Sequence, residues 1–346
     1  MKLLVTTDGS KASEGAVKYA ARLFSSFKTD SHITLITVLD DSSLRLFKKH
    51  TPKGAVEDYL RELADKNLEW AIKYLNKTKL PHDMAITERY SILHDFPLRP
   101  DPEALQAGRY KIKFYGSQPS RFGIVPRYGQ ADEVKWFEAK PAYLLHVVNA
   151  WEEGDEVVMV GTPYKMHLDD QGQPDGKRLE KTIHNRQRDF MLYEWRFDLK
   201  TGQTRERCID DVLNTEFPVI NSQYQGRKNR YSYNIIFAHG GKEEVRFPGL
   251  VKYDISAGSY VAYSAGPQFF YNEPGFAPRD NSQSEDDGYL VVLVWNPHEE
   301  QSEIQIFDCK GAKMAEGPIA RVILPRRIPH GFHATFVSQT TLNRWK

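Results

Sequence analysis

Proline and glycine are distributed very unevenly along this chain of 346 residues. Residues 1–79 contain one Pro and three Gly, whereas the remaining 267 residues contain 18 Pro and 20 Gly. Both residue types interrupt helices and are frequent in turns between strands. Because the chain is long enough for two domains, the break indicates two architectures, and we place the domains at 1–79 and 80–346.

The first segment alternates strand-like and helix-like patterns. Apolar runs at Leu3–Thr7 and Ile33–Leu39 predict two strands, and each is followed by apolar residues at helical spacing, within 16–24 and 56–75. The order strand, helix, strand, helix is typical of a parallel sheet with right-handed connections. We therefore expect a small, doubly wound α/β half-domain here.

Short apolar runs separated by turn residues fill the second segment, which is predicted to be mainly β. The predicted strands are Asp155–Val160, Phe190–Phe197, Ser232–Phe237, Leu250–Ile255, Tyr289–Trp295, Glu303–Phe307, Ala320–Leu324 and His333–Val337. Such spacing favours a sandwich, a barrel or a propeller, and no exact repeat singles out the propeller. The polar run Gln283–Asp287 predicts a solvated turn.

Composition excludes several classes of function. A net charge of +1 gives no electrostatic case for nucleic acid or for an anionic membrane. The two cysteines, Cys208 and Cys309, provide neither a disulfide framework nor a cysteine-based zinc site. No apolar run reaches the length of a membrane span, and Met1-Lys2 leads directly into a strand rather than an export signal. We therefore expect a cytoplasmic protein in a reducing compartment.

Eleven histidines are the main chemical resource of the chain. Three clusters place histidine beside apolar or small residues at the edge of a strand-like run, around His82, around His146, and around the pair His330 and His333. A single histidine in such a place is more often a hydrogen-bonded structural residue than a metal ligand. Three on separate β elements favour a metal site more strongly, and both interpretations stay open on the residues alone.

The first segment resembles the universal stress protein family. The match consists of the strand ending in Thr7-Asp8-Gly9-Ser10, the Ala-rich helix after it, and the strand Ile33–Leu39 ending in Asp40. It covers residues 1–79 and implies that Asp8 lies near an adenine ring. In that family a later Gly-rich loop holds the phosphates, and no such loop follows residue 79. We therefore do not expect ATP binding, and a docking piece or a fusion remnant remains the alternative.

The second segment resembles the carotenoid cleavage oxygenase family, which includes apocarotenoid, stilbene and lignostilbene dioxygenases. The matching stretches, in order over about 80–341, are 82–88, 121–127, 146–157, 216–221, 249–254, 273–279, 285–290 and 328–336. The resemblance implies a seven-bladed β-propeller with a non-haem Fe(II), an apolar polyene or stilbene-like substrate, and O2. It leaves peripheral membrane contact and the oligomeric state open.

Site residues carry over from this resemblance one by one. His82, His146 and His333 match three of the family's four iron-binding histidines, and Glu216 and Glu273 match carboxylates that accept the other ring N–H of such ligands. No catalytic residue beyond the metal ligands and no further cofactor-binding residue is predicted. Glu285 and Asp286 match a family motif that a solvated turn explains equally well. Surface or loop positions are predicted for His94, His167, His184, His239 and His298.

The chain also departs from the family pattern. Upstream of His82 the α/β segment stands where the first ligand histidine, the first carboxylate and the early blades are expected, because His32 and His50 lack the motif. We therefore expect an incomplete propeller, weakened iron binding and impaired cleavage of a carbon–carbon double bond. The alternatives are a non-catalytic fusion or truncation product, and a nucleotide-binding stress protein acting through residues 1–79.

Overall fold

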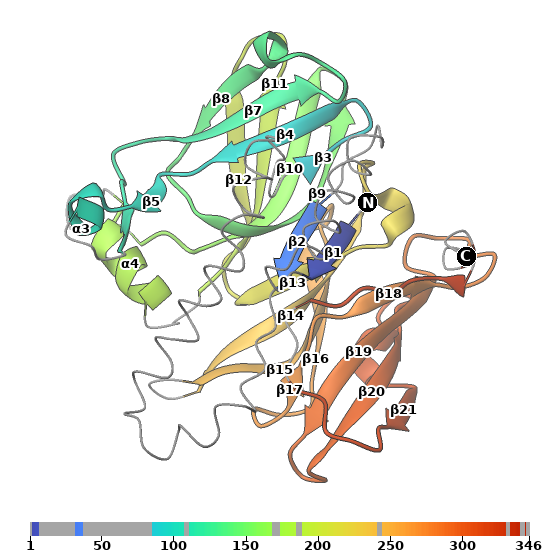
Figure 1. Cartoon of the computed structure of the whole chain (residues 1–346). Coiled ribbons are helices and arrows are strands. Elements are labelled where there is room, and N and C mark those ends of the chain that lie inside the picture. Colours follow the sequence, from blue (N-terminus) through green and yellow to red (C-terminus); the bar gives the residue numbers. More distant parts are fainter. Residues whose placement is uncertain are drawn as a thin grey trace, which may run out of the picture. The chain divides into compact units, whose positions relative to one another are not determined.

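The computed structural model describes residues 2–6, 32–36, 85–106, 111–167, 174–184, 189–240, 244–329, 333–339 and 343 (Figure 1). The chain forms two compact units, Met1–Met84 and Ala85–Lys346. In the first unit, strand β1 (Lys2–Thr6) pairs in parallel with β2 (His32–Ile36), with Leu3 opposite Ile33. The parallel pairing of the two predicted strands is therefore confirmed. The two predicted helices and Asp8 lie outside the described residues.

The second unit begins with an antiparallel sheet of four strands in the order β3-β4-β7-β8. These strands are β3 (Ala85–Ile86), β4 (Tyr90–Asp95), β7 (Ser120–Pro126) and β8 (Lys135–Ala139). Between β4 and β7 lie a small hairpin and a short helix: β5 (Leu98–Pro100), α3 (Pro102–Gln106) and β6 (Ile112–Phe114). A 3-10 turn, η3 (Ala131–Glu133), precedes β8.

A second antiparallel sheet has the order β12-β11-β10-β9. Its strands are β9 (Leu144–Glu153), β10 (Glu156–Pro163), β11 (Leu192–Asp198) and β12 (Thr204–Asp210). Helix α4 (Gly176–His184) lies between β10 and β11. Gly154 closes the β9–β10 hairpin with φ of 60°, a left-handed conformation that glycine adopts without steric cost.

The third sheet contains nine strands, seven of them in the order β13-β14-β15-β17-β19-β20-β21. They are β13 (Thr215–Val219), β14 (Tyr231–Gly240), β15 (Glu244–Asp254), β16 (Ser259–Ser264), β17 (Phe270–Tyr271), β18 (Gly275–Pro278), β19 (Gly288–Asn296), β20 (Gln301–Asp308) and β21 (Ala320–Ile323). β16 pairs with β15 and β18 with β19. The 3-10 turns η4 (Ser222–Tyr224) and η5 (Lys313–Glu316) lie in its connections. The mainly β prediction is thus confirmed. No sheet closes among the described strands, so a seven-bladed propeller is not confirmed.

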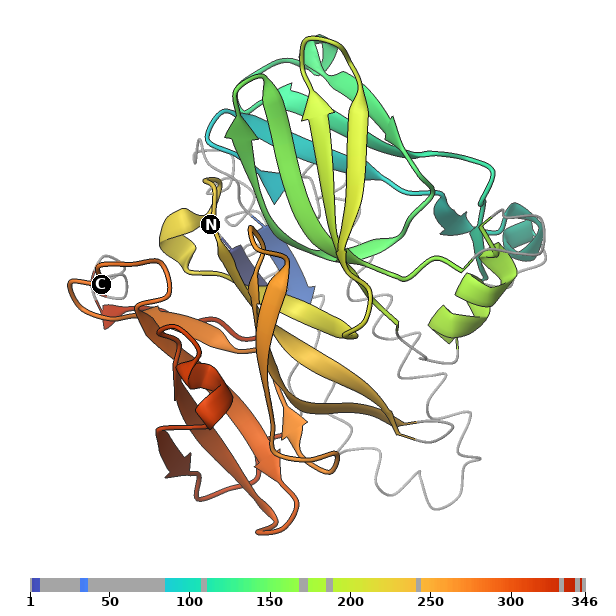
Figure 2. The same ribbon diagram turned by 180° about the vertical axis from the view of Figure 1, so that it is seen from behind.

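Strand β10 explains how the sheets stack (Figures 1 and 2). Its residues are almost all buried, because alternate side chains face two different cores. Val157 and Met159 belong to the core shared with the first sheet, in which Phe122 packs on Phe197 with ring centroids 5.0 Å apart. Val158 belongs to a second core with residues of β15. The second sheet is therefore covered on both faces.

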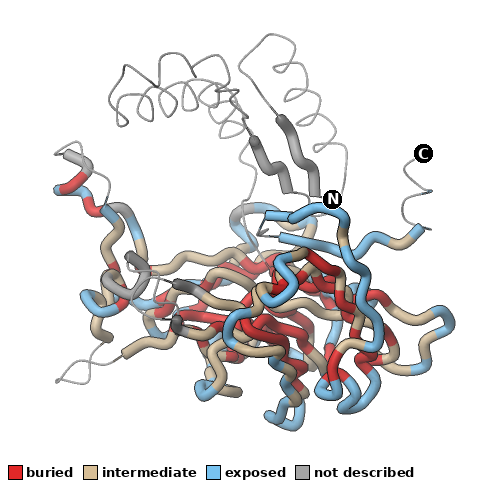
Figure 3. Tube along the Cα trace, turned by 90° about the horizontal axis from the view of Figure 1, so that it is seen from below, coloured by how far each residue is buried: buried red, intermediate tan, exposed pale blue. Residues whose placement is uncertain are grey.

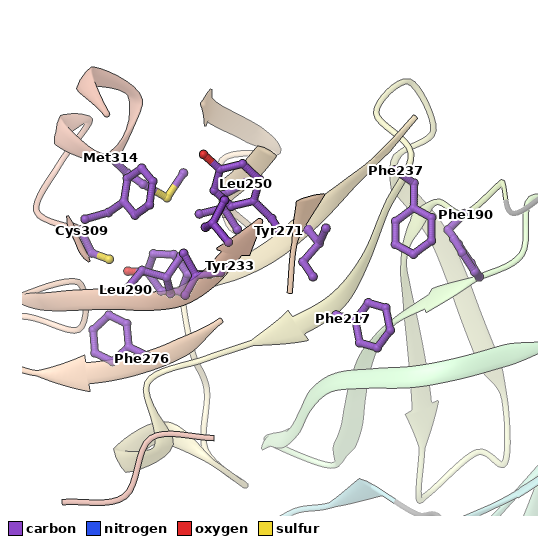
Figure 4. Close-up of a cluster of buried hydrophobic side chains, with 14 of the residues drawn as sticks. Phe190, Phe217, Tyr233, Phe237, Leu250, Tyr271, Phe276, Leu290, Cys309 and Met314 are labelled. Carbon is purple, nitrogen blue, oxygen red and sulfur yellow. The ribbon is translucent and has the colours of Figure 1, made fainter. Parts of the chain in front are cut away.

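A third core lies on the third sheet and is the largest of the three clusters of buried residues. Figure 3 shows that buried residues run through the interior of the second unit, with exposed residues in its outer loops. Figure 4 shows part of it, with Phe217, Phe237 and Phe190 gathered together and Cys309 and Met314 at the other end. Both cysteines of the chain are free thiols, Cys208 exposed and Cys309 buried. This core supports β13, which carries Glu216, and the strands β17 and β18 on either side of Glu273.

The polar run Gln283–Asp287 is not a simple solvated turn. Asp286 is buried, and its carboxylate accepts a hydrogen bond from the equally buried ammonium of Lys252 at 2.8 Å. The carboxylate of Glu285 accepts the backbone N–H groups of Arg230 and Tyr231. The segment does form a turn, but the prediction that it is solvated was wrong for Asp286, because sequence polarity does not reveal a buried cation on a distant strand.

A network of charged residues at the far end of β9 predicts a pH effect on stability. The carboxylate of Glu153 lies 2.8 Å from the guanidinium of Arg196 and 2.5 Å from the ammonium of Lys228. Burial alone would raise the pKa of Glu153, but these two cations outweigh it and lower that pKa to about 2. A lowered pKa stabilises the folded state at pH values above the ordinary range for Glu, and the stabilisation is lost as the pH falls towards 2.

Replacement Glu153→Gln should therefore lower the free energy of unfolding at pH 7, with a difference from wild type that vanishes as the pH approaches 2. Urea unfolding across this pH range measures the effect. Glu316→Gln, at an exposed position, is the control and should show no such trend. A constant difference between Glu153→Gln and wild type at all pH values would contradict the assignment.

Candidate metal centre

His146 lies on β9 where the pairing with β10 is irregular. The register between β9 and β10 shifts on both sides of Gly161. Such a β-bulge changes the direction in which the nearby side chains point. A Cβ on Gly161 would approach Leu144 Cδ1 to 2.8 Å and the carbonyl oxygen of His146 to 3.2 Å, so the two strands cross closely here. The hydroxyl oxygen of the neighbouring Thr162 lies 3.2 Å from the carbonyl oxygen of His146.

Glu216, on β13, holds the ring of His146. The two side chains meet at 2.6 Å between His146 Nδ1 and Glu216 Oε2, and Glu216 is 1% exposed. Its other oxygen accepts the hydroxyl of buried Thr162 at 2.8 Å. Because an ionised carboxylate can only accept, Nδ1 carries the proton, and in the neutral ring the lone pair lies on Nε2.

His333 is held in the same way from another part of the chain. Its Nδ1 lies 3.1 Å from Glu273 Oε2, and the same oxygen accepts the backbone N–H of Ala334 at 2.6 Å. Glu273 sits in the short link between β17 and β18. The segment that carries His333 also crosses Gly275, where a Cβ would approach the backbone N of Phe336 to 2.9 Å.

The two histidines come together although they are far apart in sequence. Their ring centroids lie 5.3 Å apart, with the ring planes at 83°. The ring of Phe217 contacts both, with centroids 5.2 Å from His146 and 5.8 Å from His333. Phe217 has φ of 52°, which is unusual for a bulky residue. An unusual backbone conformation of this kind is frequent at functional sites.

Two of the three predicted ligands and both predicted carboxylates thus lie in one place. His82 lies outside the described residues. Within the described ranges, no group of three or more His, Cys, Asp or Glu side chains is arranged to hold a metal ion. The described part of the chain therefore offers a pair of oriented imidazoles rather than a complete ligand set.

The remaining histidines do not join this site where the structure describes them. His94 lies on β4 and packs between Phe96 and Phe122, so the prediction of a surface or loop position was wrong for it. His239 lies in β14 and His184 ends α4, so neither is a loop residue. His167 approaches Asp189 at 3.8 Å and His298 contacts Phe269, both outside strands and helices.

Sequence reasoning missed two residues of the site. Thr162 carries no pattern that would reveal its contact with Glu216. Phe217 belongs to the stretch 216–221 that matched the family, but its contact with both histidine rings depends on the fold. Among the described residues, no helix is long and apolar enough to cross a membrane.

The fold and the pair of carboxylate-bound histidines agree with the family comparison. The family described as retinal pigment epithelial membrane protein matches residues 35–338, and the chain belongs to this family. The match begins inside the range 1–79, so residues 35–79 are matched by this family as well. The boundary at residue 79 therefore stays a prediction.

Curated relatives carry dioxygenase names. A carotenoid 9,10(9',10')-cleavage dioxygenase of Crocus sativus is 35% identical over 284 residues, covering 77% of this chain and 49% of the relative. One of Arabidopsis thaliana is 30% identical over 98% of this chain and 62% of its own length. A zeaxanthin 7,8(7',8')-cleavage dioxygenase of Crocus sativus is 33% identical, over 75% of this chain and 69% of its own length. The chain spans about half the length of the first of these relatives.

Solved structures show the same fold. A lignostilbene dioxygenase of Pseudomonas brassicacearum superimposes with a TM-score of 0.62 and 27% identity, over 74% of this chain and 55% of that one. A cobalt-substituted apocarotenoid oxygenase of Synechocystis gives a TM-score of 0.60 and 26% identity, over 73% of this chain and 52% of that one.

Proposed function

We propose that this chain is a non-haem Fe(II)-dependent dioxygenase that cleaves a carbon–carbon double bond in an apolar carotenoid, apocarotenoid or stilbene-like substrate. O2 is the co-substrate. His146 and His333, together with His82, are the proposed iron ligands, and Glu216 and Glu273 are the proposed orienting carboxylates. The names of the relatives support this reaction class.

One observation carries the proposal. Two imidazoles from distant parts of the chain lie side by side, and each is bound through Nδ1 to its own carboxylate. Metal-binding histidines nearly always have such a partner, because it fixes the tautomer and makes the other nitrogen a better ligand. Neutral imidazole suits Fe(II). The residues present therefore fit an iron ion.

The chain's own residues have simple roles in this proposal. Iron, when bound, supplies the redox chemistry that makes O2 reactive. Glu216 and Glu273 keep the rings of His146 and His333 in one orientation, while Thr162 fixes Glu216. The ring of Phe217 contacts both histidine rings and adds an apolar group beside them, which suits an apolar substrate.

The number of ligands leads to a finer proposal. This chain offers three histidines in matching positions, whereas the family site has four. We therefore propose weaker iron binding than a four-histidine site provides, and impaired turnover. The cytoplasmic location and a peripheral contact with membranes are likewise proposals. They are tested by fractionating cells and by sedimenting the protein with liposomes.

Metal analysis tests the proposal directly. We expect about one metal ion per chain after anaerobic incubation with Fe(II) or Co(II) and desalting, because imidazole ligands suit both ions. His146→Ala should hold much less, and His298→Ala, at a residue in the β19–β20 connection, should bind as wild type does. Equal and near-zero metal in wild type and His146→Ala would refute the metal site. Cleavage of an apocarotenoid and of a stilbene is then assayed with the loaded protein.

A further inference from the structure

A chain of buried polar side chains crosses the third sheet. The hydroxyl of Tyr271, on β17, donates to Gln305 Oε1 at 2.9 Å, and Gln305 Nε2 donates to Glu303 Oε1 at 2.6 Å. Arg321 Nε, on the edge strand β21, donates to Glu303 Oε2 at 2.8 Å. Every hydrogen bond therefore points towards the same carboxylate.

Burial makes this chain costly unless all of its members are paired. Tyr271 and Glu303 are 0% exposed and Gln305 is 3% exposed, whereas the guanidinium of Arg321 reaches the surface. An unpaired polar group at such a depth destabilises a fold, while a fully bonded chain makes it rigid. Burial is also the main reason why the pKa of Tyr271 is raised, so the phenol stays a proton donor.

The end of the polar chain lies beside the candidate metal centre in sequence. Strand β17 has only two residues. Phe270 pairs with Phe247 of β15, and the strand pairs with Val294 and Trp295 of β19. So short a strand has few backbone hydrogen bonds of its own. The side chain of Tyr271 supplies a further anchor to β20, two residues before Glu273.

Asn272 provides a second anchor in the same link. Its backbone N–H donates to the carbonyl of Leu293 at 3.0 Å, and its side-chain amide donates to the same carbonyl at 2.9 Å. Residues 271 and 272 are thus both tied to neighbouring strands. Glu273 follows at once and binds His333 and Ala334.

We propose that the polar chain Tyr271–Gln305–Glu303–Arg321 is a positioning device. It fixes the link between β17 and β18, and so holds the carboxylate of Glu273 where it orients His333. These four are positioning residues and not catalytic ones. The effect on metal binding rests on the proposed function, but the ordering of the segment at Ala334 does not.

Hydrogen exchange in the metal-free, full-length protein tests this inference. Tyr271→Phe removes one hydroxyl and keeps the ring. It should make the amide of Ala334 exchange about tenfold faster, as expected when one buried hydrogen bond is lost and a local opening becomes easier. Glu303→Gln weakens the chain from its far end and should change the same amide in the same direction. In a Glu273→Ala background, Tyr271→Phe should add nothing.

Two controls separate positioning from general destabilisation. Tyr193→Phe removes a hydroxyl that donates to Glu206 at 3.3 Å in the second sheet, and it should leave the Ala334 amide unchanged. Exchange in β9 and β10 should stay at the wild-type level in Tyr271→Phe. Unchanged exchange at Ala334 in both network variants would overturn the inference, and so would a uniform increase throughout the chain.

Cobalt titration then separates the inference from the proposed function. Tyr271→Phe should bind Co(II) about tenfold more weakly than wild type. This is the smallest loss of affinity usually seen when a hydrogen-bond partner of a metal ligand is removed. Faster exchange at Ala334 together with a wild-type protein that holds no Co(II) would support the positioning role and refute the metal site. Wild-type Co(II) affinity in Tyr271→Phe would overturn the link between the polar chain and His333.

Discussion

Asp286→Asn is expected to lower the free energy of unfolding by about 3–5 kcal/mol, the usual cost of removing one partner from a buried ion pair. Lys252 is 3% exposed, and its ammonium group donates a hydrogen bond to the carboxylate of Asp286 at 2.8 Å. Its other protons go to the carbonyls of Cys309 and Gly311 at 2.7 and 2.9 Å. The amide of Asn would leave this buried cation without a countercharge.

A neighbouring residue provides the control. Asp287 pairs with the partly exposed Arg279 in the same turn, so Asp287→Asn should cost much less than Asp286→Asn. Urea unfolding followed by circular dichroism measures both. The double variant Lys252→Met, Asp286→Asn removes the buried cation as well and should recover part of the loss. Equal costs for Asp286→Asn and Asp287→Asn would show that the Lys252 pair contributes no more than a surface pair.

Phe217→Ala is expected to destabilise the protein by about 3–5 kcal/mol, because it removes a large buried ring from the core of the third sheet. Phe217→Gly should be no less stable than Phe217→Ala. In extended strands Gly costs about 0.5–1 kcal/mol more than Ala. At φ of 52°, however, any Cβ is strained by about 1–2 kcal/mol, and only Gly escapes that strain.

Phe237 is the matched control for this comparison. It is 5% exposed, belongs to the same core and lies within strand β14, with its ring stacked on that of Phe217 at 6.1 Å. Phe237→Gly should therefore be less stable than Phe237→Ala, the reverse of the order at Phe217. The same order at both positions, measured by urea unfolding, would contradict strain at Phe217. Weaker Co(II) binding in Phe217→Ala would further indicate that the ring of Phe217 supports His146 and His333.

The strand content was predictable because apolar runs and turn residues alternate along residues 80–346. The stacking of the sheets was partly predictable as well. The apolar run at Val157–Val160 has no polar face, which indicates a strand covered on both sides. The periodicity of the sequence does not show which sheets cover this strand. That depends on packing between strands distant in sequence, such as Val158 of β10 and Val251 of β15.

The candidate site was found through a family resemblance and not through local pattern. His146 and His333 look like other strand-edge histidines, and only the fold brings their rings to 5.3 Å. The polarity of Asp286 suggested solvent because the buried Lys252 lies on another strand. His94 was misplaced in the same direction, since its ring packs against Phe96 and against Phe122 of another strand. Burial of a polar side chain is decided by partners that the local sequence does not contain.

The apolar character of β10 leaves its register poorly defined. If the strand slipped by one residue, Val158 and Val160 would enter the core that now holds Val157 and Met159, and the reverse would happen in the other core. Each core would still receive apolar side chains. The hydrogen bond at the end of the strand does not tolerate such a slip, because it would move Thr162 away from Glu216. The register of β10 and the orientation of His146 thus depend on the same carboxylate, that of Glu216.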